Sequence, residues 1–177
     1  GYEPIRYMMI SSQYRSPINY SAEVIEQAKN SLERLYTCRD NIDFALKNAH
    51  EGGEIPAFTE QRKQEFIDAM EDDLNTADAL AAVFMLVRDI NTAISAGAGK
   101  KALKAFAEVF DELTGVLGLV YNRRTETLDS EIEELINKRT EARKNKDFKT
   151  ADEIRDKLKE MGIILEDTPQ GVKWTRS

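Results

Sequence analysis

Cysteine is almost absent from this sequence. Cys38 is the single cysteine among 177 residues, which excludes an intrachain disulfide and a metal site built from cysteines. No apolar run approaches the roughly 20 residues that span a bilayer, and no signal peptide is visible. These absences argue against a disulfide-stabilised secreted protein and against a membrane partner. We therefore expect a reducing, cytoplasmic location.

Glycine and proline are also scarce, with 9 and 4 residues, whereas hydrophobic residues make up 41% and charged residues 32%. This composition is typical of a helix-rich globular protein. A chain of this length suits one domain or two small ones. Its first residues, GYEPIRYMMI, contain no initiator methionine, and we interpret them as part of a longer chain.

Helical periodicity dominates the first two thirds of the sequence. Apolar residues recur at three- and four-residue spacing along 22–50, 59–71, 76–94 and 103–117. Ser21 and Asn75 stand where N-caps are needed, and Gly52 follows the first segment. Short loops between long amphipathic segments predict an antiparallel helical bundle.

A different pattern follows a linker that we place at 121–130. Ser130 and Glu133 form a capping box before a helix at 132–142, and Gly162 ends a second helix at 151–161. GIILEDT, TPQG and VKWTR then indicate a strand, a turn and a returning strand. The predicted fold is mainly α: a bundle in 1–122, then a small α+β module of two helices and a β-hairpin in 123–177.

Charge divides the chain along the same lines. Residues 138–159 contain nine Lys or Arg against five Asp or Glu, whereas 1–128 contain 14 basic and 20 acidic residues. One interpretation is a solvated helix surface with ion pairs at i,i+4 spacing. The other is a nucleic-acid footprint. The composition does not choose between them, because the net charge of the whole chain is −7.

Four sequence strings carry a family resemblance. LEDTPQGVKW and MEDDLNTADAL, together with SSQYRSPINYS and RLYTCRDNI, resemble the C-terminal half of bacterial cysteinyl-tRNA synthetases, in the family's order and over essentially the whole chain. The resemblance implies a stem-contact segment, a DALR-type helical bundle and an anticodon-binding domain. It also implies two partners, tRNA(Cys) and the catalytic domain of the same parent chain, and we expect a monomer.

The motifs that carry the family's chemistry are missing. The HIGH and KMSKS signatures do not occur, and Cys38 and His50 alone cannot supply a cysteine, histidine and glutamate zinc set. In the family, ATP and zinc bind in the catalytic domain. We therefore expect no catalytic residue, metal or cofactor here, and we interpret Asp72 and Asp73 as a solvated turn.

The resemblance places the anticodon-reading positions on Arg143, Phe148, Asp152, Arg155 and Asp167. An aromatic ring stacks on a splayed base, a guanidinium donates to guanine O6 and N7, and a carboxylate accepts from amino groups. Phe148 interrupts a polar run between two helices. From the residues alone its ring could equally be offered to a base or fill the space between the helices.

Three basic residues are further candidates for contacts with the tRNA backbone. Lys144 and Lys146 flank the corner between the two helices of the module, and Lys side chains suit phosphate. Arg15 lies in the loop of the string QYRSP, where it could touch the inner side of the tRNA. Trp174 follows the predicted turn, and we expect it to pack beneath the hairpin.

Three functions are compatible with the sequence. The first is the tRNA-binding part of a cysteine–tRNA ligase, whose parent reaction joins cysteine to tRNA(Cys) with ATP. The second is part of a related cysteine ligase that uses no tRNA, which would have no reason to keep an anticodon module. The third is a helical interaction module without a nucleic-acid role. The tail from Leu165 to Trp174 favours the first.

Overall fold

The computed structural model describes residues 2–121, 129–145, 147–168 and 171–176. Contacts between the elements divide the chain into two compact units, 1–123 and 124–177, and each is described by itself. The elements in chain order are α1 (Glu3–Ile10), α2 (Ala22–Asn48), α3 (Phe58–Glu71), α4 (Thr76–Ser95), α5 (Lys100–Val116), α6 (Asp129–Lys144), α7 (Phe148–Glu160), β1 (Ile163–Thr168) and β2 (Gly171–Arg176). The prediction of a mainly α fold is confirmed.

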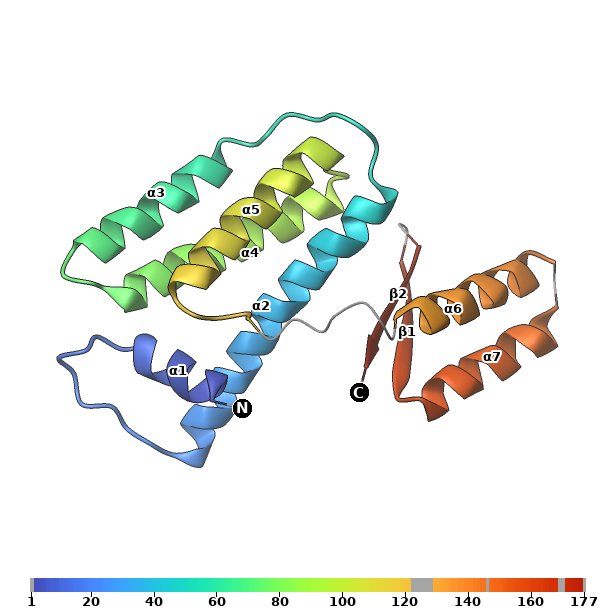
Figure 1. The fold of residues 1–177 in the computed structure, drawn as a ribbon, viewed down its shortest axis with the longest axis horizontal. Coiled ribbons are helices and arrows are strands. Elements are labelled where there is room, and N and C mark those ends of the chain that lie inside the picture. The colour runs from blue at the N-terminus through green and yellow to red at the C-terminus, as the bar shows by residue number, and fades with distance from the viewer. Residues whose placement is uncertain (1, 122–128, 146, 169–170, 177) are drawn as a thin grey trace. The chain divides into compact units, whose positions relative to one another are not determined.

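The first unit is a bundle in which α2, α3, α4 and α5 run alongside one another (Figure 1). Each helix turns its apolar stripe inward, as the three- and four-residue spacing predicts. Its core includes the fully buried side chains of Leu35, Ile42, Val83, Leu86, Ile90, Leu103, Phe106 and Phe110. The ring of Phe58 stacks on that of Phe106, with centroids 5.3 Å apart.

Both predicted N-caps are confirmed. The hydroxyl of Ser21 accepts a hydrogen bond from the backbone N–H of Val24 at 3.3 Å. The side-chain oxygen of Asn75 accepts one from Asp78 N–H at 3.2 Å. Each cap satisfies a backbone donor that has no partner inside the helix, so the starts of α2 and α4 are fixed by local sequence.

Helix α1 is absent from our sequence predictions. Pro4 stands in its first turn, where the missing N–H costs nothing, and Tyr7 and Met8 are buried in the bundle core. Figure 1 shows α1 beside the N-terminal end of α2. Eight residues make a marginal helix in isolation, so α1 depends on packing against residues distant in sequence.

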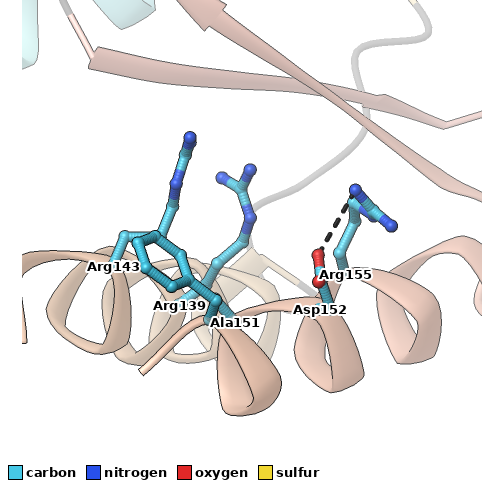
Figure 2. Close-up of a pocket in the computed structure, with 6 residues that line it drawn as sticks. Arg139, Arg143, Ala151, Asp152 and Arg155 are labelled. Atoms are coloured by element: carbon cyan, nitrogen blue, oxygen red, sulfur yellow. Dashed lines mark ion pairs between the residues drawn. The ribbon is translucent and has the colours of Figure 1, made fainter. Parts of the chain in front are cut away.

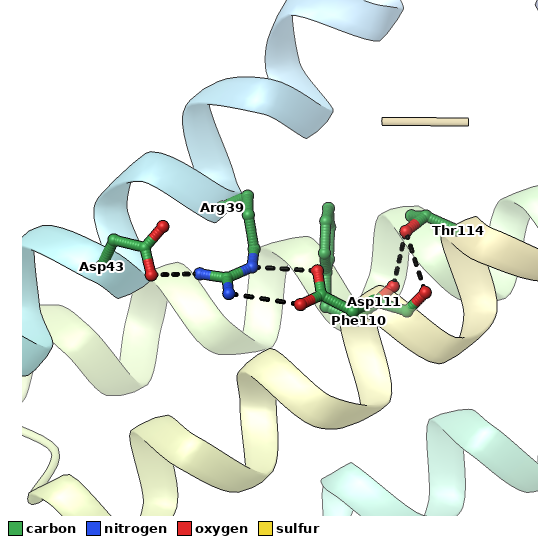
Figure 3. Close-up of polar contacts among 5 residues, drawn as sticks. All are labelled: Arg39, Asp43, Phe110, Asp111 and Thr114. Atoms are coloured by element: carbon green, nitrogen blue, oxygen red, sulfur yellow. Dashed lines mark hydrogen bonds and ion pairs between the residues drawn. The ribbon is translucent and has the colours of Figure 1, made fainter. Parts of the chain in front are cut away.

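A polar cluster joins α2 to α5. The Arg39 guanidinium donates to Asp111 at 2.9 and 3.2 Å and also pairs with Asp43, one turn further along α2 (Figure 3). Thr114 donates its hydroxyl hydrogen to the backbone oxygen of Phe110 at 2.7 Å. Arg39 is 8% exposed, and a charge so deeply buried requires paired carboxylates.

The second unit packs α6 and α7 against each other and against the strands. Among the residues described there, the buried core cluster contains Ile132, Ile136, Leu158 and Ile163. Trp174 is partly buried and packs on this core, which confirms our prediction for it. Gly162, after α7, adopts φ +74°, the left-handed conformation expected of a glycine that ends a helix.

Strands β1 and β2 pair in antiparallel register, with Leu165 opposite Trp174 and Asp167 opposite Val172. The connection predicted as a tight turn, residues 169–170, lies outside the described residues. So do residues 122–128 of the linker predicted at 121–130, and the side chains of the capping box at Ser130 and Glu133. The linker is shorter than predicted, because α6 already begins at Asp129. Among the helices that the structure describes, none is long and apolar enough to cross a membrane.

Candidate functional site

The corner between α6 and α7 is built by local hydrogen bonds. Asp147 caps α7: its carboxylate accepts from the N–H of Thr150 at 3.2 Å and from the Thr150 hydroxyl at 2.6 Å. Its own N–H donates to the backbone oxygen of Ala142 at 2.9 Å, at the end of α6. The cap therefore fixes where α7 begins relative to α6, and Phe148 is the first residue of α7.

A pocket of about 110 Å³ lies at this corner, lined by Arg139, Arg143, Phe148, Ala151, Asp152 and Arg155. Two of these residues stand four positions apart on α6, and four follow helical spacing on α7. Residues at this spacing share one face of a helix. The pocket thus combines one face of each helix, and it brings together four of the five residues predicted to read an anticodon.

Phe148 is exposed at the N-terminal end of α7. The side chain is 63% exposed, whereas a ring that fills the space between two helices would be buried. Of the two interpretations left open by the sequence, the plug between helices is therefore wrong. The exposed ring face is available for stacking.

The pocket carries three guanidinium groups and one carboxylate. In Figure 2 the labelled side chains of Arg139, Arg143 and Arg155 extend to the same side of the helices. Asp152 pairs with Arg155 at 3.4 Å, and Asp156 approaches the same guanidinium at 3.8 Å. These pairs are more than half exposed and contribute little to stability. A ligand can therefore replace them at low cost.

Arg139 was missed by the sequence analysis. It lines the pocket and is only 7% exposed, whereas Arg155 on α7 is open to solvent. The signal was available, because Arg139 precedes Arg143 by four positions and so shares its helix face. Its burial depends on how α6 meets α7, which the sequence alone does not specify.

The other predicted residues stand as follows. Lys144 is exposed in the last turn of α6. Lys146 and the side chain of Asp167 lie outside the described residues, although the backbone of Asp167 pairs with Val172 in the two-stranded sheet.

Arg15 belongs to the first unit and is held there. It pairs with Asp73 at 2.9 Å and donates to the hydroxyl of Tyr14 at 2.9 Å. That hydroxyl in turn donates to the Asp73 carboxylate at 3.1 Å. Asp73 and Leu74, in the turn before α4, both adopt positive φ, at 55° and 53°. The contacts of Arg15 and Tyr14 with Asp73 connect the loop after α1 to this turn.

Among the described residues, no three His, Cys, Asp or Glu side chains lie close enough together to bind a metal ion. Cys38 is buried in the bundle, and burial raises the pKa of its thiol to about 12. The thiol is therefore protonated at neutral pH, whereas metal ligation and nucleophilic attack both require the thiolate.

Comparisons with known proteins bear on both units. Residues 65–121 match the family model described as the DALR domain, and residues 125–174 match the cysteinyl-tRNA ligase anticodon binding domain. The pocket at the corner of α6 and α7 lies within the second match.

Curated relatives extend the similarity to nearly the whole chain. The chain is 46% identical to the cysteine–tRNA ligases of Clostridioides difficile (strain 630) and Halalkalibacterium halodurans, and 44% identical to that of Caldicellulosiruptor saccharolyticus. Each match covers 98% of this chain but only 38–39% of the relative.

Proposed function

We propose that this chain, which corresponds to the C-terminal region of the cysteine–tRNA ligase family, binds tRNA(Cys) and reads its anticodon. The observation that carries the proposal is the corner pocket. It gathers Arg143, Phe148, Asp152 and Arg155 inside the anticodon-binding domain. The ring of Phe148 lies on one side of the pocket, and the guanidinium groups of the arginines and the carboxylate of Asp152 supply its hydrogen-bond donors and acceptor.

The chemistry of the pocket suits an unpaired base. Single-stranded RNA is read by stacking a base on an aromatic side chain and by hydrogen bonds to its edge. Phe148 supplies the ring, Arg143 and Arg155 can donate to O6 and N7 of a guanine, and Asp152 can accept from N–H groups of a base. Asp167 is proposed to accept in the same way.

Contacts with the tRNA backbone are proposed for three basic residues. Lys144 is exposed in the last turn of α6, where a phosphate beside the bound base would meet it, and Lys146 is proposed for the same role from its place in the sequence. Arg15 is proposed to contact the inner side of the tRNA from the first unit. Its pairing with Asp73 is exposed to solvent, so a phosphate of the tRNA can replace the carboxylate at low cost.

The parent activity is proposed to require other parts of the protein. ATP-dependent attachment of cysteine needs a nucleotide site and a cysteine-selecting zinc, which the family places in its catalytic domain. That domain of the same parent chain is the second proposed partner. The 177-residue chain alone should not support cysteine-dependent pyrophosphate exchange with ATP, and turnover above a buffer blank would contradict this.

A double-mutant cycle tests anticodon reading. Each of Arg143, Asp152, Arg155 and Asp167 is changed to Ala and combined with a substitution at each base of the GCA anticodon, and binding is measured by filter retention. Loss of a base contact should cost roughly 1–3 kcal/mol against the GCA anticodon. It should cost much less against a tRNA that already lacks the contacted base.

Matched controls are available on α7 itself. Lys157→Ala removes an exposed positive charge, as the arginine variants do, and Glu153→Ala removes an exposed negative charge, as Asp152→Ala does. Both residues lie outside the pocket, so neither variant should show coupling with any anticodon base. Lys144→Ala should weaken binding to every tRNA alike and lower its salt dependence. Zero coupling for all four variants of the cycle (Arg143, Asp152, Arg155 and Asp167), in folded proteins, would refute anticodon reading.

A further inference from the structure

Asp147 connects α6 to α7 through its backbone and its side chain. Its N–H donates to the backbone oxygen of Ala142 at 2.9 Å, and its backbone oxygen accepts from the N–H of Ala151 at 3.2 Å. Its carboxylate accepts from the N–H and the hydroxyl of Thr150, at 3.2 and 2.6 Å. One residue therefore closes the end of α6 and starts α7.

These bonds reach the backbone on both sides of the corner pocket. Ala142 precedes Arg143, which lines the pocket from α6, and Ala151 lines it from α7. Asp147 itself is not one of the lining residues. It therefore holds the backbone that carries the pocket and leaves the space for a base to other side chains.

The start of α7 depends on this cap, because the helix meets the core of its unit further along. It packs on the described core cluster through Ile154 and Leu158. Among the described residues, the first turn (148–151) contributes none to that cluster, although Ala151 is buried. The cap satisfies a backbone donor of this turn that has no partner inside the helix, so its loss should loosen the turn.

Phe148 is the pocket residue next to the cap. It follows Asp147 directly as the first residue of α7, and its side chain is 63% exposed. A buried ring takes its position from the side chains packed around it. An exposed ring lacks most of that packing, so its direction depends on the backbone that carries it.

We infer that Asp147 is a positioning residue for anticodon binding, whose cap holds the first turn of α7 so that the ring of Phe148 is in place before a base stacks on it. The inference rests on the proposed anticodon reading and adds a residue that does not touch the RNA. A ring already in place loses less conformational entropy on binding. The apparent affinity falls in proportion to the fraction of molecules in which it is in place.

The test measures binding of the isolated anticodon stem-loop of tRNA(Cys) to the 177-residue chain that carries Asp147→Ala. Loss of an N-cap shifts the equilibrium of a helix start by a factor of roughly 2 to 30, so binding should weaken by about that factor. The salt dependence of binding should stay unchanged, because no phosphate contact is lost. Circular dichroism establishes that the variant is folded.

A double-mutant cycle shows whether Asp147 acts through the ring. Phe148→Ala removes the stacking surface, so the addition of Asp147→Ala to it should weaken binding little further. Thr150→Val removes one of the two bonds to the carboxylate and should weaken binding less than Asp147→Ala.

Asp147→Asn separates the cap from its charge. Asparagine keeps an N-cap acceptor of similar strength but carries no charge, so this variant should bind the stem-loop as the unsubstituted chain does. Rescue by asparagine would assign the effect of Asp147→Ala to the lost cap.

Ile163→Val is the matched control for lost stability. Ile163 is buried in the core of the same unit and does not line the pocket. Removal of one buried carbon there should lower stability by an amount similar to the loss of a cap. The folded variant should nevertheless bind the stem-loop with unchanged affinity.

Four results would overturn the positioning role. The first is unchanged stem-loop binding by Asp147→Ala while Phe148→Ala binds more weakly, which leaves anticodon reading intact. The second is an equal loss in Asp147→Asn, which assigns the effect to charge. The third is an equal loss in Ile163→Val, which assigns it to stability. The fourth is unchanged binding by Phe148→Ala and by the arginine variants of the pocket, which refutes anticodon reading and the positioning role with it.

Discussion

The carboxylate of Glu3 accepts a hydrogen bond from the backbone N–H of Val120, 2.6 Å away and 117 positions later in the chain. Its other oxygen accepts from the hydroxyl of Tyr36 at 2.8 Å. Glu3 is 8% exposed, and Val120 adopts φ +56°, a conformation that is strained for a β-branched residue. Such strain persists only where surrounding contacts hold it, and Glu3 provides one of them.

Glu3→Ala should therefore destabilise the first unit. It leaves a buried N–H without a partner, which costs about 1–3 kcal/mol of unfolding free energy. Glu3→Gln retains a carbonyl acceptor and should cost less. Urea unfolding followed by circular dichroism measures both. Glu108→Ala, an exposed carboxylate on α5, is the control, and a loss in that variant as large as in Glu3→Ala would contradict the prediction.

The two carboxylates that pair with Arg39 should differ in importance. Asp111 accepts twice and its side chain is 33% exposed, whereas that of Asp43 is 50% exposed. Asp111→Ala leaves the buried guanidinium short of acceptors and should cost roughly 1–3 kcal/mol. Asp43→Ala should cost less than about 1 kcal/mol. Equal unfolding midpoints for the two variants would rule out this ranking.

The start of α7 should loosen in acid. The hydroxyl and the N–H of Thr150, which donate to Asp147, hold the pKa of that carboxyl below its usual range. A pKa that is depressed in the folded state adds stability above the usual pKa, and this stability is lost as the pH falls through the folded value. NMR titration of the Thr150 amide should report that loss.

Asp147→Asn provides the control for this titration. Asparagine is an equally good N-cap but does not titrate, so the acid-dependent shift of the Thr150 amide should disappear while α7 persists. A carboxyl at position 147 that titrates at the ordinary aspartate value would show that the two hydrogen bonds do not form in solution.

The local features of the fold could be predicted from the sequence. Ser21 and Asn75 cap helices through bonds that span three residues, and the long apolar stripes of α4 and α5 define one face each. Helix α1 could not be predicted in this way, because its eight residues gain stability from contacts distant in sequence: from α2, from α4 and from the residues after α5. Glu3 likewise shows no signal, since its partner Val120 is 117 positions away.

The anticodon pocket was predictable in part, from family resemblance and not from local sequence patterns. Family resemblance supplied the residue types, and helical spacing explains why Phe148, Asp152 and Arg155 share one face of α7. The exposure of Phe148 and the burial of Arg139 depend on how α6 and α7 meet at the Asp147 cap. The same tertiary dependence hid the groove between α2 and α4 that Arg34 and Arg88 line, because its two sides are at least 49 positions apart along the chain.

Substitution of Phe148 should affect tRNA binding without affecting the stability of the fold. Because its ring is 63% exposed, Phe148→Ala should leave the unfolding midpoint nearly unchanged. It should nevertheless weaken tRNA binding by roughly 5- to 150-fold, the equivalent of about 1–3 kcal/mol for one stacked base. Phe148→Trp keeps an aromatic face and should bind at least as well as the unsubstituted chain.

The control for Phe148 is another exposed apolar side chain of the same unit. Ile164 on β1 is 56% exposed and lies outside the pocket, so Ile164→Ala removes comparable surface without touching the site. If both alanine variants weaken binding equally, the loss reflects general surface change and not stacking. If Phe148→Ala alone loses affinity, and loses it equally for every anticodon, then the ring holds a base without identifying it, and discrimination among anticodons belongs to the arginines and carboxylates around it.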